Sequence, residues 1–131
     1  MQRMAIITAL AHEARKSLLL LEAVADCLGH DPTSGASDPL NGVILRRRRS
    51  AARLRSLLRA EGADRTLPPM GLPVVLDAGM VMAAEAKLLA YLERWLLRVD
   101  LPDDLRHLIT EQREDVHQAT LILSRIRAGN G

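Results

Sequence analysis

Two charged residues stand on helical faces that are otherwise apolar, and they are the strongest candidates for chemistry in this sequence. Glu85 lies in the middle of the apolar stripe of Pro73–Val99, and Arg47 lies on the apolar face of the segment before it. A charged side chain that is buried without a partner is costly, because it loses its hydration. The sequence therefore indicates either an internal ion pair between Arg47 and Glu85, or a metal or small-ligand site that contains both.

The level of each side chain along its helix can be estimated by counting from the loops. Arg47 lies about fifteen residues before one loop and Glu85 about twelve after it, so antiparallel helices rising ~1.5 Å per residue bring both to the middle of a bundle. Glu13 and Ser17 reach a similar level, and Gln112 lies about one turn away. The predicted buried polar layer comprises Glu13, Arg47, Ser50, Glu85 and Gln112.

The ion pair is the favoured interpretation of this layer, because a guanidinium among carboxylates repels a divalent cation. A literal Glu-x-x-His motif does occur at Glu114 and His117. On a helix whose core face is centred on Leu105 and Val116, however, Glu114 lies about 180° away and His117 about 120° away. Both are expected to face water, so we predict no metal site and no cofactor.

The elements that must position these residues are helices. Four stretches carry apolar residues at a period of about 3.6, and proline and glycine bound them. Their predicted limits are residues 2–29, 39–61, 73–99 and 102–128. No stretch alternates as a half-buried strand does. The 131 residues therefore predict one all-α domain, 1–131, built as an up-down-up-down antiparallel four-helix bundle.

The polar layer resembles the ligand pattern of the ferritin-like superfamily, whose bundles carry one Glu on each of two helices and a Glu-x-x-His pair on each of the others. Glu13 and Glu85 match the single glutamates, whereas the paired positions hold Arg47 with Ser50 and Gln112 with Asp115. The segment AEAKLLAYLERWLLRVDLPDDLRHLITEQREDV is similar to an uncharacterised bacterial branch in which many members lack a complete metal site. The resemblance implies a non-catalytic structural or protein-interaction module without a functional di-metal centre.

A second resemblance lies near the N-terminus and implies a different function. Residues 12–18, HEARKSL, are similar to the phosphoacceptor segment of sensor histidine kinases, with Ser17 in place of the proline of that family. His12 lies opposite the apolar stripe of its helix and is expected to be exposed. The alternative function is therefore a histidine-containing phosphotransfer bundle with His12 as phosphoacceptor.

Composition limits the remaining classes of function. The formal net charge is only +2, and the run Arg46–Arg49 is spread around its helix, so nucleic-acid binding is not expected. The single cysteine, Cys27, rules out an internal disulfide. No apolar segment approaches the ~20 residues of a membrane span, and we expect a cytoplasmic protein.

Apolar residues beyond the main stripes indicate a partner. Leu19 and Leu20 extend the stripe of the first helix, and Met80 and Tyr91 extend that of the third. Such an apolar surplus predicts self-association, with a dimer as the simplest form. The sequence leaves the identity of any other protein partner open.

Overall fold

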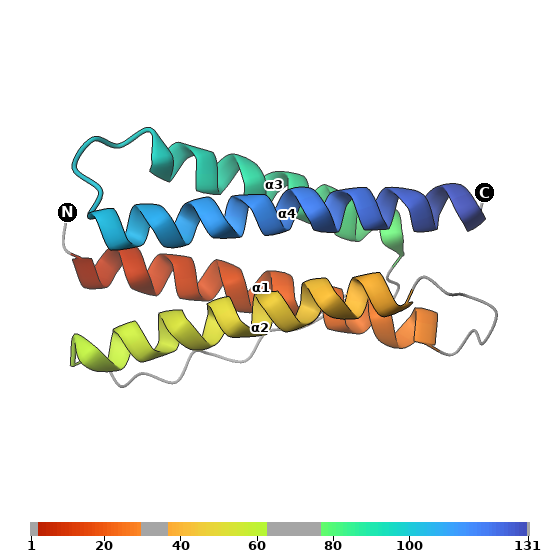
Figure 1. Cartoon of the computed structure of the whole chain (residues 1–131), viewed down its shortest axis with the longest axis horizontal. Helices are drawn as coiled ribbons and strands as arrows, with labels where there is room; N and C mark the ends of the chain where they lie inside the picture. The colour runs from red at the N-terminus through yellow and green to blue at the C-terminus, as the bar shows by residue number, and fades with distance from the viewer. Residues whose placement is uncertain (1–2, 30–36, 63–76, 131) are drawn as a thin grey trace.

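Four α-helices make up the regular structure of the protein in the computed structural model (Figure 1), which describes residues 3–29, 37–62 and 77–130. They are α1 Arg3–Gly29, α2 Ser37–Ala60, α3 Ala78–Leu96 and α4 Asp103–Asn130. The described residues contain no strand, so the prediction of an all-α protein is confirmed. None of the described helices is long and apolar enough to cross a membrane.

The third helix is shorter than the sequence pattern predicts. It begins at Ala78, where the carboxylate of Asp77 accepts a hydrogen bond of 2.9 Å from the amide of Met80 as an N-cap. The predicted residues 73–76 lie outside the described part of the chain. The predicted end at Val99 is wrong, since α3 stops at Leu96 and Val99 is 99% exposed.

A contact from the next helix marks this end. Arg106 of α4 donates hydrogen bonds to the carbonyl oxygens of Leu96, at 2.9 Å, and Arg98, at 2.5 Å. Carbonyls in the last turn of a helix have no partner within the helix, and this guanidinium satisfies that of Leu96 together with the carbonyl of Arg98 just beyond the helix. The chain then turns, and Leu101 is buried under the end of the core before α4 begins.

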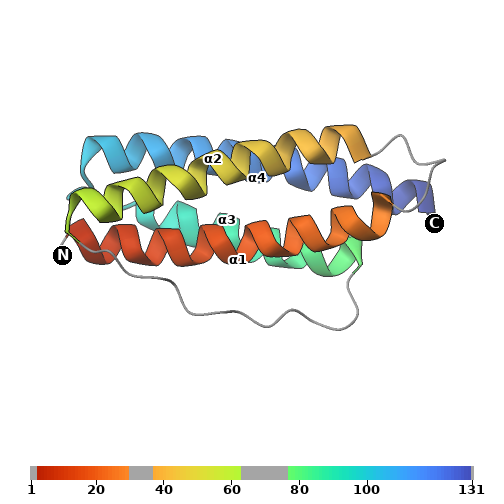
Figure 2. The ribbon, with the colours of Figure 1, turned by 90° about the horizontal axis from the view of Figure 1, so that it is seen from below.

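The helices form two antiparallel pairs, α1 with α2 and α3 with α4, and the pairs meet with α1 beside α3 and α2 beside α4. Figures 1 and 2 show α2 and α3 running in the same direction along the bundle. The predicted up-down-up-down order is therefore wrong, because α2 ends and α3 begins at opposite ends of the bundle. The diagonally placed helices are the ones that run in parallel.

The core consists of two apolar clusters, one toward each end of the bundle. One is built from the first half of α1, the second halves of α2 and α3, and the first half of α4. The other joins the second half of α1, the starts of α2 and α3, and the second half of α4. Between them lie the buried polar and charged residues, which are Ser17, Arg47, Glu85 and Asp115. A polar layer thus divides the core, with one member on each helix.

Candidate functional site

Arg47 is the centre of the polar layer. Its Nη1 donates to Oε1 of Glu85 at 2.5 Å, and its Nε donates to Oδ2 of Asp115 at 2.9 Å. Arg47, Glu85 and Asp115 are only 4%, 1% and 9% exposed. The predicted buried ion pair between Arg47 and Glu85 is therefore present, and a second carboxylate shares the guanidinium.

The directions of α2 and α3 explain how the pair forms. Arg47 lies ten residues after the first residue of α2 and Glu85 seven after that of α3, and both helices start at the same end of the bundle. The two residues therefore stand at nearly the same level and meet across the diagonal of the core. The long, planar guanidinium of arginine suits this span because it can hold two carboxylates at once.

Asp115 is the member of the layer that the sequence pattern does not predict to be buried, although it occupies a paired position of the ferritin-like ligand pattern together with Gln112. It lies one residue before the core residue Val116 and three after Gln112, at the edge of the apolar stripe of α4. Its second oxygen, Oδ1, accepts a hydrogen bond of 3.1 Å from Nε of Arg46, whose side chain is half exposed. The four groups form a chain of alternating charge, with two guanidinium groups and two carboxylates.

The other predicted members, Glu13, Ser50 and Gln112, approach the cluster without joining it. They are partly buried, and with Arg47 they line a cavity of about 10 Å³, which has room for about one water molecule. No hydrogen bond joins any of the three to Arg47 or Glu85. Ser17, which also lines this cavity, donates to the carbonyl oxygen of Ala14 in its own helix at 3.0 Å.

Three buried atoms of the layer have no hydrogen-bond partner among the described residues. They are Oε2 of Glu85, Oε1 of Gln112 and Nη2 of Arg47. Nη2 lies 2.9 Å from Oδ2 of Asp115, close enough for charge attraction but not aligned as a donor. The cluster is thus balanced in charge but incompletely hydrogen-bonded.

Burial raises the pKa of Glu85 above its ordinary value of 4.5, because the carboxylate has lost its hydration. The charge and hydrogen bond of Arg47 act in the opposite direction, and the charge of Asp115 adds to the rise. Since two carboxylates share the guanidinium of Arg47, the attraction does not fully offset the desolvation of Glu85.

The described residues contain no group of three or more His, Cys, Asp or Glu side chains placed to hold a metal ion. Glu114 and His117 are exposed, in agreement with their predicted positions on α4. In the centre of the bundle, the guanidinium of Arg47 already stands between Glu85 and Asp115. The arrangement therefore supplies charge neutralisation by arginine where a metal would need open carboxylates.

His12, the residue of the alternative phosphotransfer hypothesis, is partly buried on α1. This differs from the exposed position that its place on the helix predicts. Cys27 lies exposed near the end of the same helix as a free thiol.

No family model, curated protein or solved structure matches this chain.

Proposed function

We propose that this protein is a ferritin-like helical bundle without a functional di-metal centre, and that it serves as a structural or protein-interaction module. The observation that carries the proposal is the position of Arg47 between Glu85 and Asp115, where it occupies the space between the carboxylates of α3 and α4 and, together with Arg46, balances their charge. A guanidinium in that position makes an additional divalent cation electrostatically unfavourable.

The order and direction of the helices support the ferritin-like part of the proposal. Two antiparallel helix pairs are joined between opposite ends of the bundle, and ferritin-like folds have one such long connection. Glu85 and Asp115 project into the core from the two helices of one pair. Both features are compatible with a bundle whose metal ligands have been replaced.

Metal analysis tests the absence of a di-metal centre. The purified protein is incubated with Fe²⁺, Mn²⁺ or Zn²⁺, freed of excess metal and measured by elemental analysis, with Glu85→Gln as the matched variant. We expect far less than one metal ion per chain in both proteins. Stoichiometric metal in the wild type that is lost in Glu85→Gln would overturn the proposal.

We further propose that the chain self-associates through the face formed by α1 and α3. A groove of about 540 Å³ runs between these helices, with Ala83, Ala84 and Ala90 among its lining residues and the exposed Met80 at its edge. The charged lining consists of one acid, Glu13, and three cations, Lys16, Lys87 and Arg94. Two copies related by a two-fold axis can pair each Glu13 with a cation of the other copy. Leu20 and Tyr91 also line the groove, whereas Leu19 is partly buried beside it.

Light scattering at tens of micromolar protein tests this assembly. We expect the mass of a dimer for the wild type and that of a monomer for Ala84→Arg, which places a long charged side chain in the groove. Ala52→Arg, on the opposite face of the bundle, is the matched control and should remain dimeric. A monomeric wild type would remove the support for self-association.

A further inference from the structure

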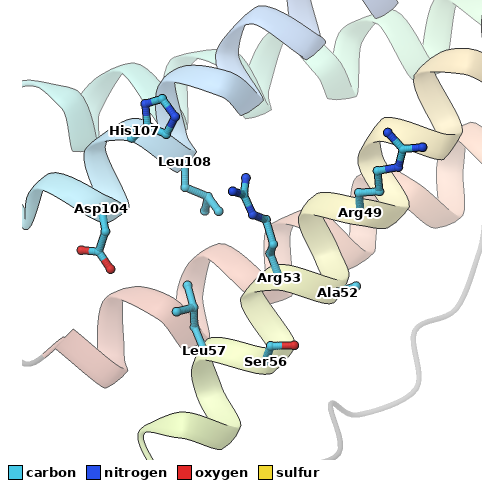
Figure 3. Close-up of a pocket in the computed structure, with 8 residues that line it drawn as sticks. All are labelled: Arg49, Ala52, Arg53, Ser56, Leu57, Asp104, His107 and Leu108. Carbon is cyan, nitrogen blue, oxygen red and sulfur yellow. The ribbon is translucent and has the colours of Figure 1, made fainter.

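A second groove lies on the opposite face of the bundle, between α2 and α4 (Figure 3). Its volume is about 710 Å³, within the range of roughly 300–1,000 Å³ that is typical of small-molecule sites. Neither Glu85 nor Arg47 lines it, so it is separate from the buried charged layer. It is the larger of the two grooves, and its lining combines apolar and cationic side chains.

The apolar part of the groove is formed by both helices. Leu57 of α2 and Leu108 of α4 project into the space between them in Figure 3, and Ala52 lines the groove farther along α2, toward Arg49. Leu108 also belongs to the hydrophobic core, so the floor of the groove is fixed by packing. A short hydrocarbon or aromatic body laid across these side chains would remove apolar surface from water.

The charges along the groove are paired, with one exception. Arg53 donates to Glu111 at 2.8 Å, and Asp104 is held by Arg3. Arg49, about one turn before Arg53 on α2, has no ion-pair partner among the described residues. The groove therefore carries one uncompensated positive charge at one end of its apolar floor.

The acidic groups near Arg49 do not neutralise it. Glu114 lines the neighbouring stretch of the same seam together with Arg49, but no ion pair joins the two side chains. Glu111 is already in contact with Arg53 and with His107. Because Arg49 is the one cation of the groove without an ion pair among the described residues, a ligand with a single negative charge fits better than a phosphate dianion. The dianion would need a second free cation.

We propose that the groove between α2 and α4 binds an amphipathic monocarboxylate. Its carboxylate pairs with the guanidinium of Arg49, and its apolar body lies against Leu57 and Leu108. The guanidinium favours a carboxylate because its parallel N–H groups match the two oxygens. This site does not depend on the proposed absence of metal or on self-association, which concern the core and the opposite face.

Binding of sodium octanoate below its micelle concentration tests the proposal, by calorimetry and by the shifts of backbone amide resonances. We expect shifts concentrated at residues 49–57 and 104–108. Arg49→Gln should weaken octanoate binding about fivefold, the effect of one favourable exposed ion pair. Arg55→Gln, an exposed arginine of α2 outside the groove, is the matched control and should bind as the wild type does.

Two further ligands separate the charge from the apolar body. Octanamide, which has the same chain without the charge, should bind wild type and Arg49→Gln equally and more weakly than octanoate binds the wild type. Inorganic phosphate should bind weakly, because it has no apolar body. The proposal is overturned if octanoate fails to bind at millimolar concentration, if Arg49→Gln has no effect, or if phosphate binds as tightly as octanoate.

Discussion

Within the described residues, two arginines each hold carboxylates from two other helices or helix ends, one in the core of the bundle and one at its end. Arg47 joins Glu85 and Asp115 inside the core. Arg3 joins Glu61, at 2.8 Å, and Asp104, at 2.9 Å, where α1 and α4 begin and α2 has just ended. The side chains of Arg3 and Asp104 are 31% and 56% exposed, so water reaches this second cluster.

The two clusters have similar contacts but opposite effects on the pKa of a carboxylate, because water reaches only the Arg3 cluster. The hydrogen bond from Arg3 holds the pKa of Asp104 below its ordinary value of 3.8. In the core, loss of hydration raises the pKa of Glu85 despite its contact with Arg47. The ion pair at the surface thus stabilises the charged form of its carboxylate. In the buried pair, the loss of hydration destabilises the charged form by more than the guanidinium stabilises it. Contact geometry alone does not tell how much either arginine stabilises the fold.

The largest difference is expected when each arginine is removed. Arg47→Met leaves Glu85 buried without its guanidinium and Asp115 with only the half-exposed Arg46, and should lower the free energy of unfolding by about 3–5 kcal/mol. The triple variant Arg47→Met, Glu85→Leu and Asp115→Leu replaces the cluster by apolar groups and should recover most of that loss. Urea unfolding measures both, with Arg55→Met as an exposed control.

A triple variant as unstable as the sum of its single losses would show that the three residues are not coupled. In that case Arg47, Glu85 and Asp115 would not act as one cooperative charged layer, and burial would not explain a difference from the Arg3 cluster.

The second prediction concerns pH. Below pH 4.5 Glu85 is protonated in both the folded and the unfolded chain, and as the pH rises the unfolded chain loses this proton first. The contribution of Glu85 to the free energy of unfolding therefore falls as the pH rises through the pKa that Glu85 has in the folded protein. Glu85→Gln removes this dependence, so its stability relative to the wild type should increase from about pH 4 to pH 8.

Urea unfolding across that range checks the prediction, with Glu114→Gln as a control for the loss of one exposed carboxylate. A constant difference between Glu85→Gln and the wild type would mean that the buried carboxylate has the same pKa in the folded and unfolded states.

The sequence predicts the Arg47–Glu85 pair because each residue interrupts an apolar stripe, and the stripes define which side of each helix is buried. They do not define the direction of the helices. Arg47 and Glu85 lie near the middle of their segments, so counting from either end brings them to a similar level. The correct pair was therefore compatible with an incorrect order of the helices.

Asp115 and Val99 show a second limit of periodicity. Asp115 stands at the edge of its stripe, and the nearby acids of α4, Glu111 and Glu114, face water. Only its distance from Arg47 distinguishes it. Val99 continues the spacing of α3, but the helix has already ended where Arg106 of α4 binds its carbonyls. Both features depend on contacts between helices, which the spacing within one helix does not contain.

The third prediction is that the Arg3 cluster contributes much less than the Arg47 cluster. Arg3→Met should lower the free energy of unfolding by at most about 1 kcal/mol, because water solvates the freed carboxylates. The loss should shrink in 1 M NaCl, where the screening length is about 3 Å, whereas the loss in Arg47→Met should persist. Urea unfolding at low and high salt measures both. Equal losses for the two variants would contradict the role assigned to burial.

The smallest effect is expected at Asp104, and its dependence on pH should have the opposite sign to that of Glu85. Because the folded pKa of Asp104 lies below 3.8, its contribution to stability is present above that pH and is lost as the pH falls through the folded value. Asp104→Asn should therefore be destabilising at neutral pH and close to neutral in effect in strong acid.

Asp103 is also exposed in the first turn of α4, and no ion pair joins it to Arg3. The variant Asp103→Asn controls for the interaction of any first-turn carboxylate with the helix dipole. Only the excess loss in Asp104→Asn over Asp103→Asn reports on Arg3, and this excess should vanish when Arg3→Met is combined with each variant. If the excess persists without Arg3, the helix terminus rather than the guanidinium lowers the pKa of Asp104, and the two arginine clusters are less alike than their geometry indicates.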